Sequence, residues 1–229
     1  MFSPEQIYFA ILVVVQFIIL LTFHEWGHAK SADMLGDPPA RDLGRSTVNP
    51  GVHIDLWGKV QIPLSMALFS VPGIGWAKPV PVNPYNLKNP RRDLMLIAAA
   101  GPAMNIFLTF LILVLLRIAL EFTPFNPSKS SLHAVIYLRV VKPMAFYSVA
   151  LAVFNMLPLF PLDGFSVVRG LLPESAARQF EKSMPYGMPI LMCLIFLPHF
   201  LPLVPNVFGY LFHVIYAIHD LIAQIVGLR

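Results

Sequence analysis

Long apolar runs separated by short polar segments dominate the chain. Five such runs lie at 6–32, 93–120, 140–159, 189–204 and 207–226. In the first run, the apolar part is interrupted only by Gln16 and Thr22. A helix of about 20 residues crosses the hydrocarbon core of a bilayer. The pattern therefore predicts an all-α membrane protein, a polytopic helical bundle of four to five spans. The fourth run is the weak one, because Pro198 and Pro202 break it.

The connection between the first two runs follows another pattern. Apolar and polar residues alternate over 52–57, which predicts a strand. In 76–83, Pro79 and Pro81 favour an extended chain. They lie two residues apart, so both remove backbone hydrogen-bond donors from the same edge of the segment. The amides of Lys78, Val80 and Val82 all face the other edge, so this segment is predicted to be a one-sided edge strand. A small extended region is thus expected between spans one and two.

Composition agrees with a membrane protein. Hydrophobic residues make up 57% of the 229 residues and charged residues only 12%, against about 25% charged in soluble domains. The net charge of +4 comes from Lys and Arg beside apolar runs, which indicates lipid headgroups and topology, not nucleic acid. A single cysteine, Cys193, excludes an intramolecular disulfide and a multi-cysteine zinc site. We expect one integral-membrane domain over 1–229, with a catalytic core at about 6–165 and C-terminal spans at about 186–229.

Basic residues also predict the orientation. Eight of the sixteen Lys and Arg residues lie between the first two spans, within 30–92. The positive-inside rule makes this connection cytoplasmic. Span one then ends at the cytoplasmic face, and span three returns to that same face.

Candidate chemistry begins at the end of span one. His24, Glu25 and His28 form an HExxH motif on a predicted helix. Residues four apart share a helical face, so both imidazoles can bind one Zn²⁺ while Glu25 takes a proton from its water. The alternative is a pair of polar histidines at a helix end near the interface.

A catalytic zinc needs a third protein ligand. Asp163 closes the third apolar run, where Pro158 and Pro161 disrupt the helix and Gly164 permits a turn. Topology brings this carboxylate to the depth of the histidines. Asp163 could equally be the N-cap of a helix that begins near Phe165.

These motifs together resemble the site-2 protease family of intramembrane metalloproteases, in its small branch without a PDZ domain. The resemblance rests on FHEWGH at 23–28, GPAMN at 101–105, NMLPLFPLDG at 155–164, and HIDLWG and GWAKPVPVN between the first two spans. It implies that His24, His28 and Asp163 bind one Zn²⁺ per chain and that Glu25 is the general base. HIDLWG departs from the HIDPxG expected in that branch.

Two asparagines and the extended segment are further candidates. The resemblance suggests that Asn155 holds the substrate or the developing oxyanion, and the alternative is an interhelical hydrogen bond. Asn105 lies among small residues that favour close helix packing, and the resemblance also places it near the active site as a substrate-binding residue. The amides of Lys78, Val80 and Val82 could pair with an unwound substrate by strand addition.

The expected function is an intramembrane zinc metalloprotease that hydrolyses peptide bonds in or near transmembrane segments of membrane proteins. Its expected partners are a transmembrane protein or peptide substrate and the lipid bilayer, in a bacterial or archaeal cell membrane, with the active site toward the cytoplasm. A divalent metal transporter would favour several ligand clusters along a path, and a non-catalytic scaffold has no need for Glu25. The sequence fixes neither the substrate nor the oligomeric state.

Overall fold

The computed structural model describes residues 3–37, 82–122, 136–201 and 207–228. Within these ranges the chain is helical and contains no strand. The helices are α1 (Pro4–Met34), the 3-10 turn η2 (Pro84–Asn86), α5 (Pro90–Phe122), the π-helix η3 (Tyr137–Val141), α7 (Lys142–Asn155), α8 (Asp163–Leu171), α9 (Glu174–Glu181), α10 (Met184–Phe200) and α11 (Val207–Ile225). The strands predicted at 52–57 and over most of 76–83 lie outside the described residues and stay predictions.

Three helices are long and apolar enough to cross a membrane: α1, α5, and the continuous helix Tyr137–Asn155 formed by η3 and α7. This confirms an integral membrane protein built of helices. The fourth predicted run forms α10, an apolar helix shorter than these spans. The predicted count of four to five spans is therefore not confirmed.

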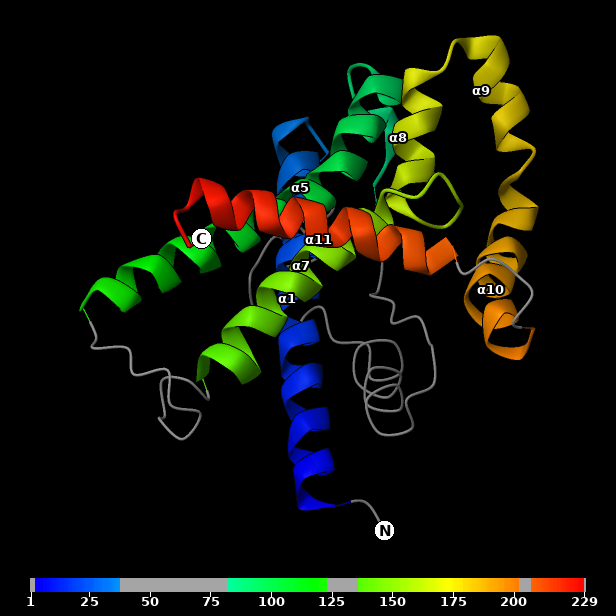
Figure 1. Cartoon of the computed structure of the whole chain (residues 1–229). Coiled ribbons are helices and arrows are strands. Elements are labelled where there is room, and N and C mark those ends of the chain that lie inside the picture. Colours follow the sequence, from blue (N-terminus) through cyan, green and yellow to red (C-terminus); the bar gives the residue numbers. More distant parts are fainter. Residues whose placement is uncertain (1–2, 38–81, 123–135, 202–206, 229) are drawn as a thin grey trace.

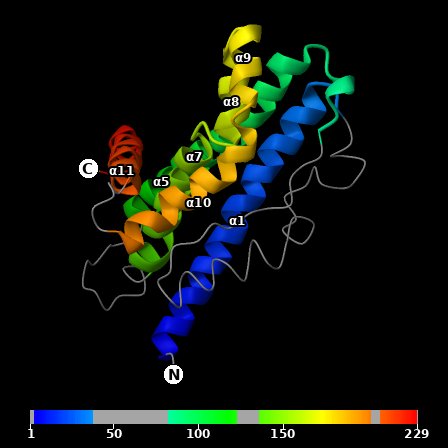
Figure 2. The ribbon, with the colours of Figure 1, turned by 90° about the vertical axis from the view of Figure 1, so that its right-hand side faces the viewer.

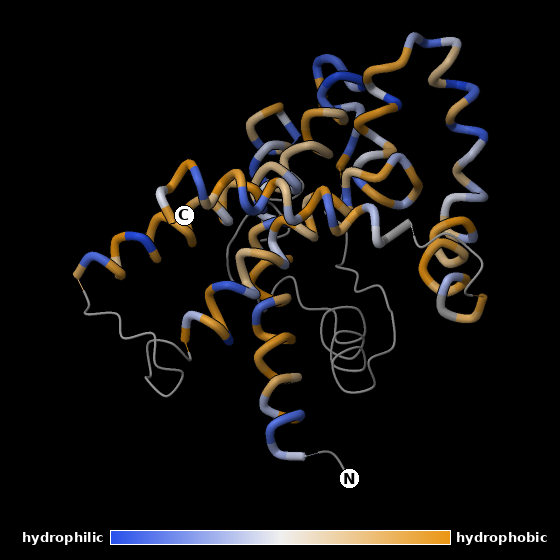
Figure 3. The backbone as a smooth tube through the Cα atoms, viewed as in Figure 1, coloured by the Kyte–Doolittle hydropathy of each residue, from blue (hydrophilic) through white to orange (hydrophobic). Residues whose placement is uncertain are grey.

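The spanning helices cross one another in a compact group (Figure 1). Helix α1 packs mainly on α5, and α5 packs on α7 and α8. Helix α11 lies across α7 and α5, whereas α10 stands at one side of the molecule in Figure 1 and in front of the other helices in Figure 2. Along the tube, hydrophilic residues gather at α9 and at the start of α5, near the end of α1 (Figure 3). The bundle therefore has one distinctly polar end.

The start of α1 is fixed by a capping box. The Ser3 hydroxyl accepts from the Gln6 amide at 3.2 Å, and the Gln6 side chain accepts from the Ser3 amide at 2.9 Å. Pro4 occupies the first turn, where its missing N–H has no intrahelical partner to lose. These residues set where the first span begins.

A polar side chain joins the middle of α1 to the start of the third span. Pro143 has no N–H, so the Arg139 carbonyl four residues earlier lacks its α-helical donor. The side-chain nitrogen of Gln16, Nε2, lies 3.2 Å from the main-chain oxygen of Arg139 and 3.4 Å from that of Val140. Gln16, the polar residue within the first apolar run, therefore donates a hydrogen bond to the carbonyl group that Pro143 leaves without a donor.

Close approach between α1 and α5 depends on small residues. A Cβ on Gly27 would lie 2.8 Å from the Ala100 oxygen and 3.0 Å from the Met104 Cβ. Glycine therefore allows the two backbones to approach at this crossing. The contact brings α5 directly behind the end of α1 that carries the histidines.

A second polar contact ties together the ends of the α1–α5 connection. Asp37 is fully buried, and its two carboxylate oxygens accept from the Asn83 amide at 2.8 Å and from the Asn86 side chain at 2.7 Å. The chain therefore re-enters the described structure beside the point where it leaves it.

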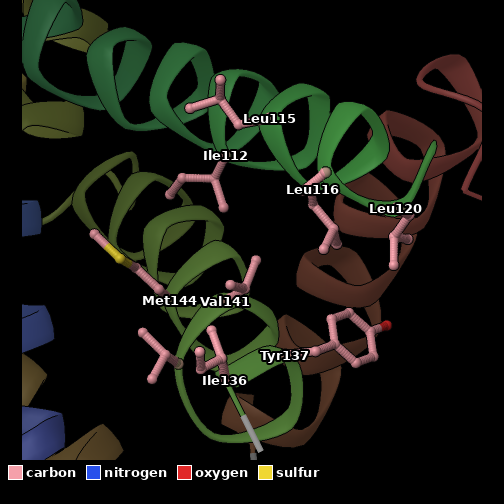
Figure 4. A pocket seen from close by; sticks show the side chains of 10 residues that line it. Ile112, Leu115, Leu116, Leu120, Ile136, Tyr137, Val141 and Met144 are labelled. Carbon is pink, nitrogen blue, oxygen red and sulfur yellow. The ribbon is translucent and has the colours of Figure 1, made fainter. Parts of the chain in front are cut away.

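An apolar groove of about 350 Å³ lies at the opposite end of α5 from the histidines. It is lined by α5 residues from Ile112 to Leu120 and by residues from Ile136 to Met144 of the next helix (Figure 4). Tyr137 contributes the only lining side chain with a polar atom. This groove therefore contains no group suited to hydrolysis.

Candidate metal centre

Three donor atoms from two helices converge at the polar end of the bundle. His24 and His28 lie on α1, and Asp163 is the first residue of α8. The two Nε2 atoms are 3.1 Å apart. Oδ2 of Asp163 lies 3.2 Å from Nε2 of His24 and 3.3 Å from Nε2 of His28. The predicted meeting of the three side chains thus occurs in the structure.

The other ring nitrogen of each histidine contacts a carbonyl-type oxygen. Nδ1 of His28 lies 2.7 Å from the Ile97 main-chain oxygen, and Nδ1 of His24 lies 2.7 Å from Oδ1 of Asn105. These oxygens only accept hydrogen bonds, so each Nδ1 must carry the proton and donate. A neutral ring then presents the lone pair of its Nε2.

The resulting cluster has the donors of a metal site. Two lone pairs and a carboxylate oxygen at 3.1–3.3 Å repel one another unless positive charge lies among them. Within the described residues, Oδ2 of Asp163 is buried and has no hydrogen-bond partner. Zinc bonds of about 2.0–2.1 Å in a tetrahedron give ligand–ligand distances of about 3.3 Å. The cluster therefore fits three vertices of a zinc tetrahedron.

Electrostatics favour the ionised form of Asp163. Burial alone would raise the pKa of its carboxyl group, but interactions with the imidazoles of His24 and His28 lower that pKa below its ordinary value. Positive charge at the imidazole edges, carried by a proton or by a bound cation, has this effect. Asp163 is therefore a carboxylate at neutral pH.

The turn between α7 and α8 aims this carboxylate. Helix α7 ends at Asn155, earlier than the predicted end of span three at residue 159, because the proline-rich segment that follows is not helical. Leu162 is the N-cap of α8 and makes no side-chain cap, so the alternative of Asp163 as N-cap is wrong.

Gly164 is needed for space, not for an unusual turn. It lies inside α8, and a Cβ there would come within 2.2 Å of the Met156 oxygen and 2.4 Å of the Leu157 oxygen. The turn thus folds directly against the start of α8. The sequence predicted that Gly164 permits a turn, whereas the structure shows that it is needed because other backbone atoms lie so close.

Helix α5 packs directly against both histidines. A Cβ on Gly101 would lie 2.3 Å from Nε2 of His28 and 2.8 Å from Cε1 of His24. Ile97, Gly101 and Asn105 follow one another at intervals of four and so share one helical face. The motif at 101–105 signalled this helix, but its glycine was expected to serve helix packing rather than to make room for two imidazoles.

The remaining predicted residues are placed as follows. Glu25 is buried, and within the described part of the chain its carboxylate makes no hydrogen bond. Asn155 donates to the Leu151 oxygen of its own helix at 2.9 Å. Asn105 is fully buried against His24, and its predicted substrate contact stays a prediction. Val82 packs near the end of α1, whereas Lys78 and Val80 lie outside the described residues.

Comparisons with known proteins agree with this centre. The model of peptidase family M50 matches residues 122–197, which include Asp163. "Putative zinc metalloprotease YwhC" of Bacillus subtilis is 32% identical over 190 residues, 81% of this chain and 80% of that protein. "Putative zinc metalloprotease Rip2" of Mycobacterium tuberculosis is 27% identical over 212 residues, 92% of this chain and 74% of that protein. No solved structure matches.

The candidate membrane-spanning helices, the His-His-Asp cluster and the matches to known proteins together indicate an integral-membrane zinc metalloprotease. The chain belongs to peptidase family M50, the site-2 protease family. The resemblance seen in the sequence is thereby confirmed, and the family supports a protease over the transporter and scaffold alternatives.

Proposed function

We propose that this protease cleaves peptide bonds in or near the transmembrane segments of other membrane proteins. The observation that carries the proposal is the burial of the two histidines of the donor cluster on a candidate membrane-spanning helix. His24 is 4% and His28 9% exposed, and both lie on α1, the most apolar part of which precedes them. Substrates reach such a site most directly from within the bilayer.

Each residue of the cluster has a proposed role. His24, His28 and Asp163 hold one zinc ion per chain. Zinc, when bound, supplies the Lewis acidity that activates water and polarises the scissile carbonyl. Glu25 takes the proton of the attacking water and delivers it to the leaving amine. Glu25 follows His24 directly in the chain and is itself buried, so its carboxylate is proposed for this transfer.

Stabilisation of the oxyanion is proposed for Asn155. Its side chain now bonds the Leu151 oxygen, and it lies at the last turn of α7, just before the turn that carries Asp163. A change of rotamer would free the amide to donate toward the substrate. The bond within the helix is therefore the resting contact of this residue.

The active site is proposed to face the cytoplasm. Among the described residues, basic side chains lie at the polar end of the bundle, and the positive-inside rule assigns this end to the cytoplasm. They include Lys88 just before α5, Arg91 and Arg92 at its start, Arg169 in α8 and Arg178 in α9. Membrane-tethered single-span proteins are suitable substrates. A substrate helix must unwind to expose its carbonyls, and the amides of Lys78, Val80 and Val82 are proposed to pair with it on the strength of their sequence pattern.

Glu25→Gln tests the mechanism directly. The variant should retain one zinc ion per chain while cleavage of a single-span model substrate in liposomes falls by at least about 100-fold. The matched control is Glu5→Gln, which makes the same chemical change at an exposed position of α1. Zinc content is measured by elemental analysis of both purified variants. Full cleavage by zinc-loaded Glu25→Gln would overturn the proposal.

A further inference from the structure

The Asn105 side chain lies where three membrane-spanning helices meet, and it is fully buried. It projects from α5 and contacts α1 and α7. An amide at this depth is costly unless its groups are bonded. Its contacts therefore indicate what the residue does.

The orientation of the Asn105 amide is fixed by its neighbours. Nδ2 lies 3.4 Å from the Leu20 main-chain oxygen and 3.4 Å from Oγ of Ser148. The Leu20 oxygen can only accept, so the NH₂ group must face it. The Ser148 hydroxyl donates to the Asn105 main-chain oxygen at 2.8 Å, which leaves its lone pairs toward Nδ2. Oδ1 is thereby turned toward His24.

This orientation determines the tautomer of His24. Oδ1 of Asn105 accepts from Nδ1, 2.7 Å away, and the lone pair is left on Nε2 beside Asp163. A flipped amide would present NH₂ to Nδ1 and would move the ring proton to Nε2, where it blocks a metal. His28 needs no such help, because its Nδ1 contacts the main-chain oxygen of Ile97.

We propose that Asn105, held by Ser148, is a positioning residue that commits His24 to metal binding through Nε2. The inference rests on the proposed metal site and deepens it. His24 depends on side chains from two other helices, whereas His28 depends on backbone. Zinc affinity should therefore be sensitive to residues of α5 and α7 that never touch the ion.

Four variants of the full-length protein in detergent test this dependence. Asn105→Leu removes the acceptor at similar size, and Asn105→Asp keeps an acceptor toward Nδ1. Ser148→Ala removes the hydroxyl that holds the amide. Thr22→Val is the matched control, since Thr22 is buried two residues from His24 and its hydroxyl donates to the Ile18 oxygen of its own helix.

Zinc affinity is measured by competition with a chromophoric chelator. Asn105→Leu should bind zinc about 10–100-fold more weakly and Ser148→Ala several-fold more weakly, as is usual when a partner of a metal-bound histidine is lost. Asn105→Asp and Thr22→Val should stay within about threefold of the wild type. Equal affinity of Asn105→Leu and the wild type would overturn the proposal.

A second measurement separates the tautomer from general damage. Nitrogen-15 NMR of the histidines in metal-free protein should show the proton on Nδ1 of His24 in the wild type and a shift toward Nε2 in Asn105→Leu. The His28 signal should not change in any variant, which makes it the internal control for folding. An unchanged His24 signal in Asn105→Leu would refute the inference while leaving zinc binding and cleavage by the wild type intact. A wild type that binds no zinc would instead refute the proposed function.

Discussion

Helices α5 and α10 are both apolar and both contain an internal proline, yet they occupy very different surroundings. Along α5, most buried positions carry small or polar residues such as Gly101, Asn105 and Thr109. Along α10, most large side chains are exposed, with Tyr186 at 64% and Phe200 at 71%. Helix α5 lies directly against the two histidines of the metal centre, whereas α10 stands beside the bundle (Figure 1).

The difference shows that hydrophobicity alone does not assign a helix to the core of a membrane protein. Lipid is as apolar as leucine, so apolar side chains gain little by leaving it. Small residues permit close packing, and bonded polar groups hold neighbouring helices together. Helix α10 has one glycine contact of this kind, between Gly187 and Phe160.

The strongest test of this contrast is Gly101→Ala. The new methyl group would lie 2.3 Å from Nε2 of His28, so the imidazoles cannot keep their positions. Zinc affinity should fall by about 100-fold or more, although alanine improves helix propensity by about 1 kcal/mol. The measurement is zinc competition in detergent. Ala103→Ser, at an exposed position of the same helix, is the control and should bind zinc normally.

A smaller loss is expected at the glycine contact of α10. In Gly187→Ala the Cβ would lie 2.3 Å from the Phe160 oxygen, so either α10 or the turn before Asp163 must move. We expect cleavage to fall by about tenfold, because small displacements near a reacting centre reduce rates strongly. The assay is kcat/KM for a model substrate in liposomes. The same value for Gly187→Ala and for Met188→Leu, at the exposed neighbouring position, would show that α10 does not influence the turn.

Gln16→Leu tests whether the hydrogen bond between Gln16 and the Arg139 oxygen stabilises the bundle away from the metal centre. The change leaves the Arg139 oxygen without its donor and should lower the free energy of unfolding by about 1 kcal/mol, with zinc affinity unchanged. Unfolding in mixed detergent micelles measures this. Pro143→Ala supplies a backbone N–H at the right position, so the cost of Gln16→Leu should shrink in that background. Additive effects of the two changes would contradict the pairing.

The smallest effect is expected at the far end of α10. Phe200→Ala removes a ring that is 71% exposed and should change the free energy of unfolding by less than about 0.5 kcal/mol. Cleavage should be unaffected. A loss comparable to that of Gln16→Leu would show that α10 is packed more tightly than the contrast with α5 implies.

The metal centre was largely predictable because its signals are local. The spacing of His24 and His28 follows from helix geometry, and charge asymmetry places the end of the third span at the same face, which brings Asp163 within reach. The helical class follows equally from the length of the apolar runs. Where α7 ends could be foreseen only roughly, since prolines mark a disruption without fixing its residue.

The supporting contacts could not be predicted in the same way. Ser148 was visible only as one polar residue in an apolar run, and no neighbouring residue indicates that Asn105 is its partner. The carbonyl of Ile97 has no sequence signal, because every residue carries one. Gln16 and Pro143 each stand out, yet their connection depends on how two distant helices cross.

The distance along the chain between the donor residues has a consequence for biosynthesis. His24 and His28 leave the ribosome early, whereas Asp163 follows only after three apolar helices have been made. A nascent chain that ends before Asp163 holds only two of the three proposed donors. If the three donors hold the zinc as proposed, the metal site becomes complete only after the third helix and the turn that follows it have been made.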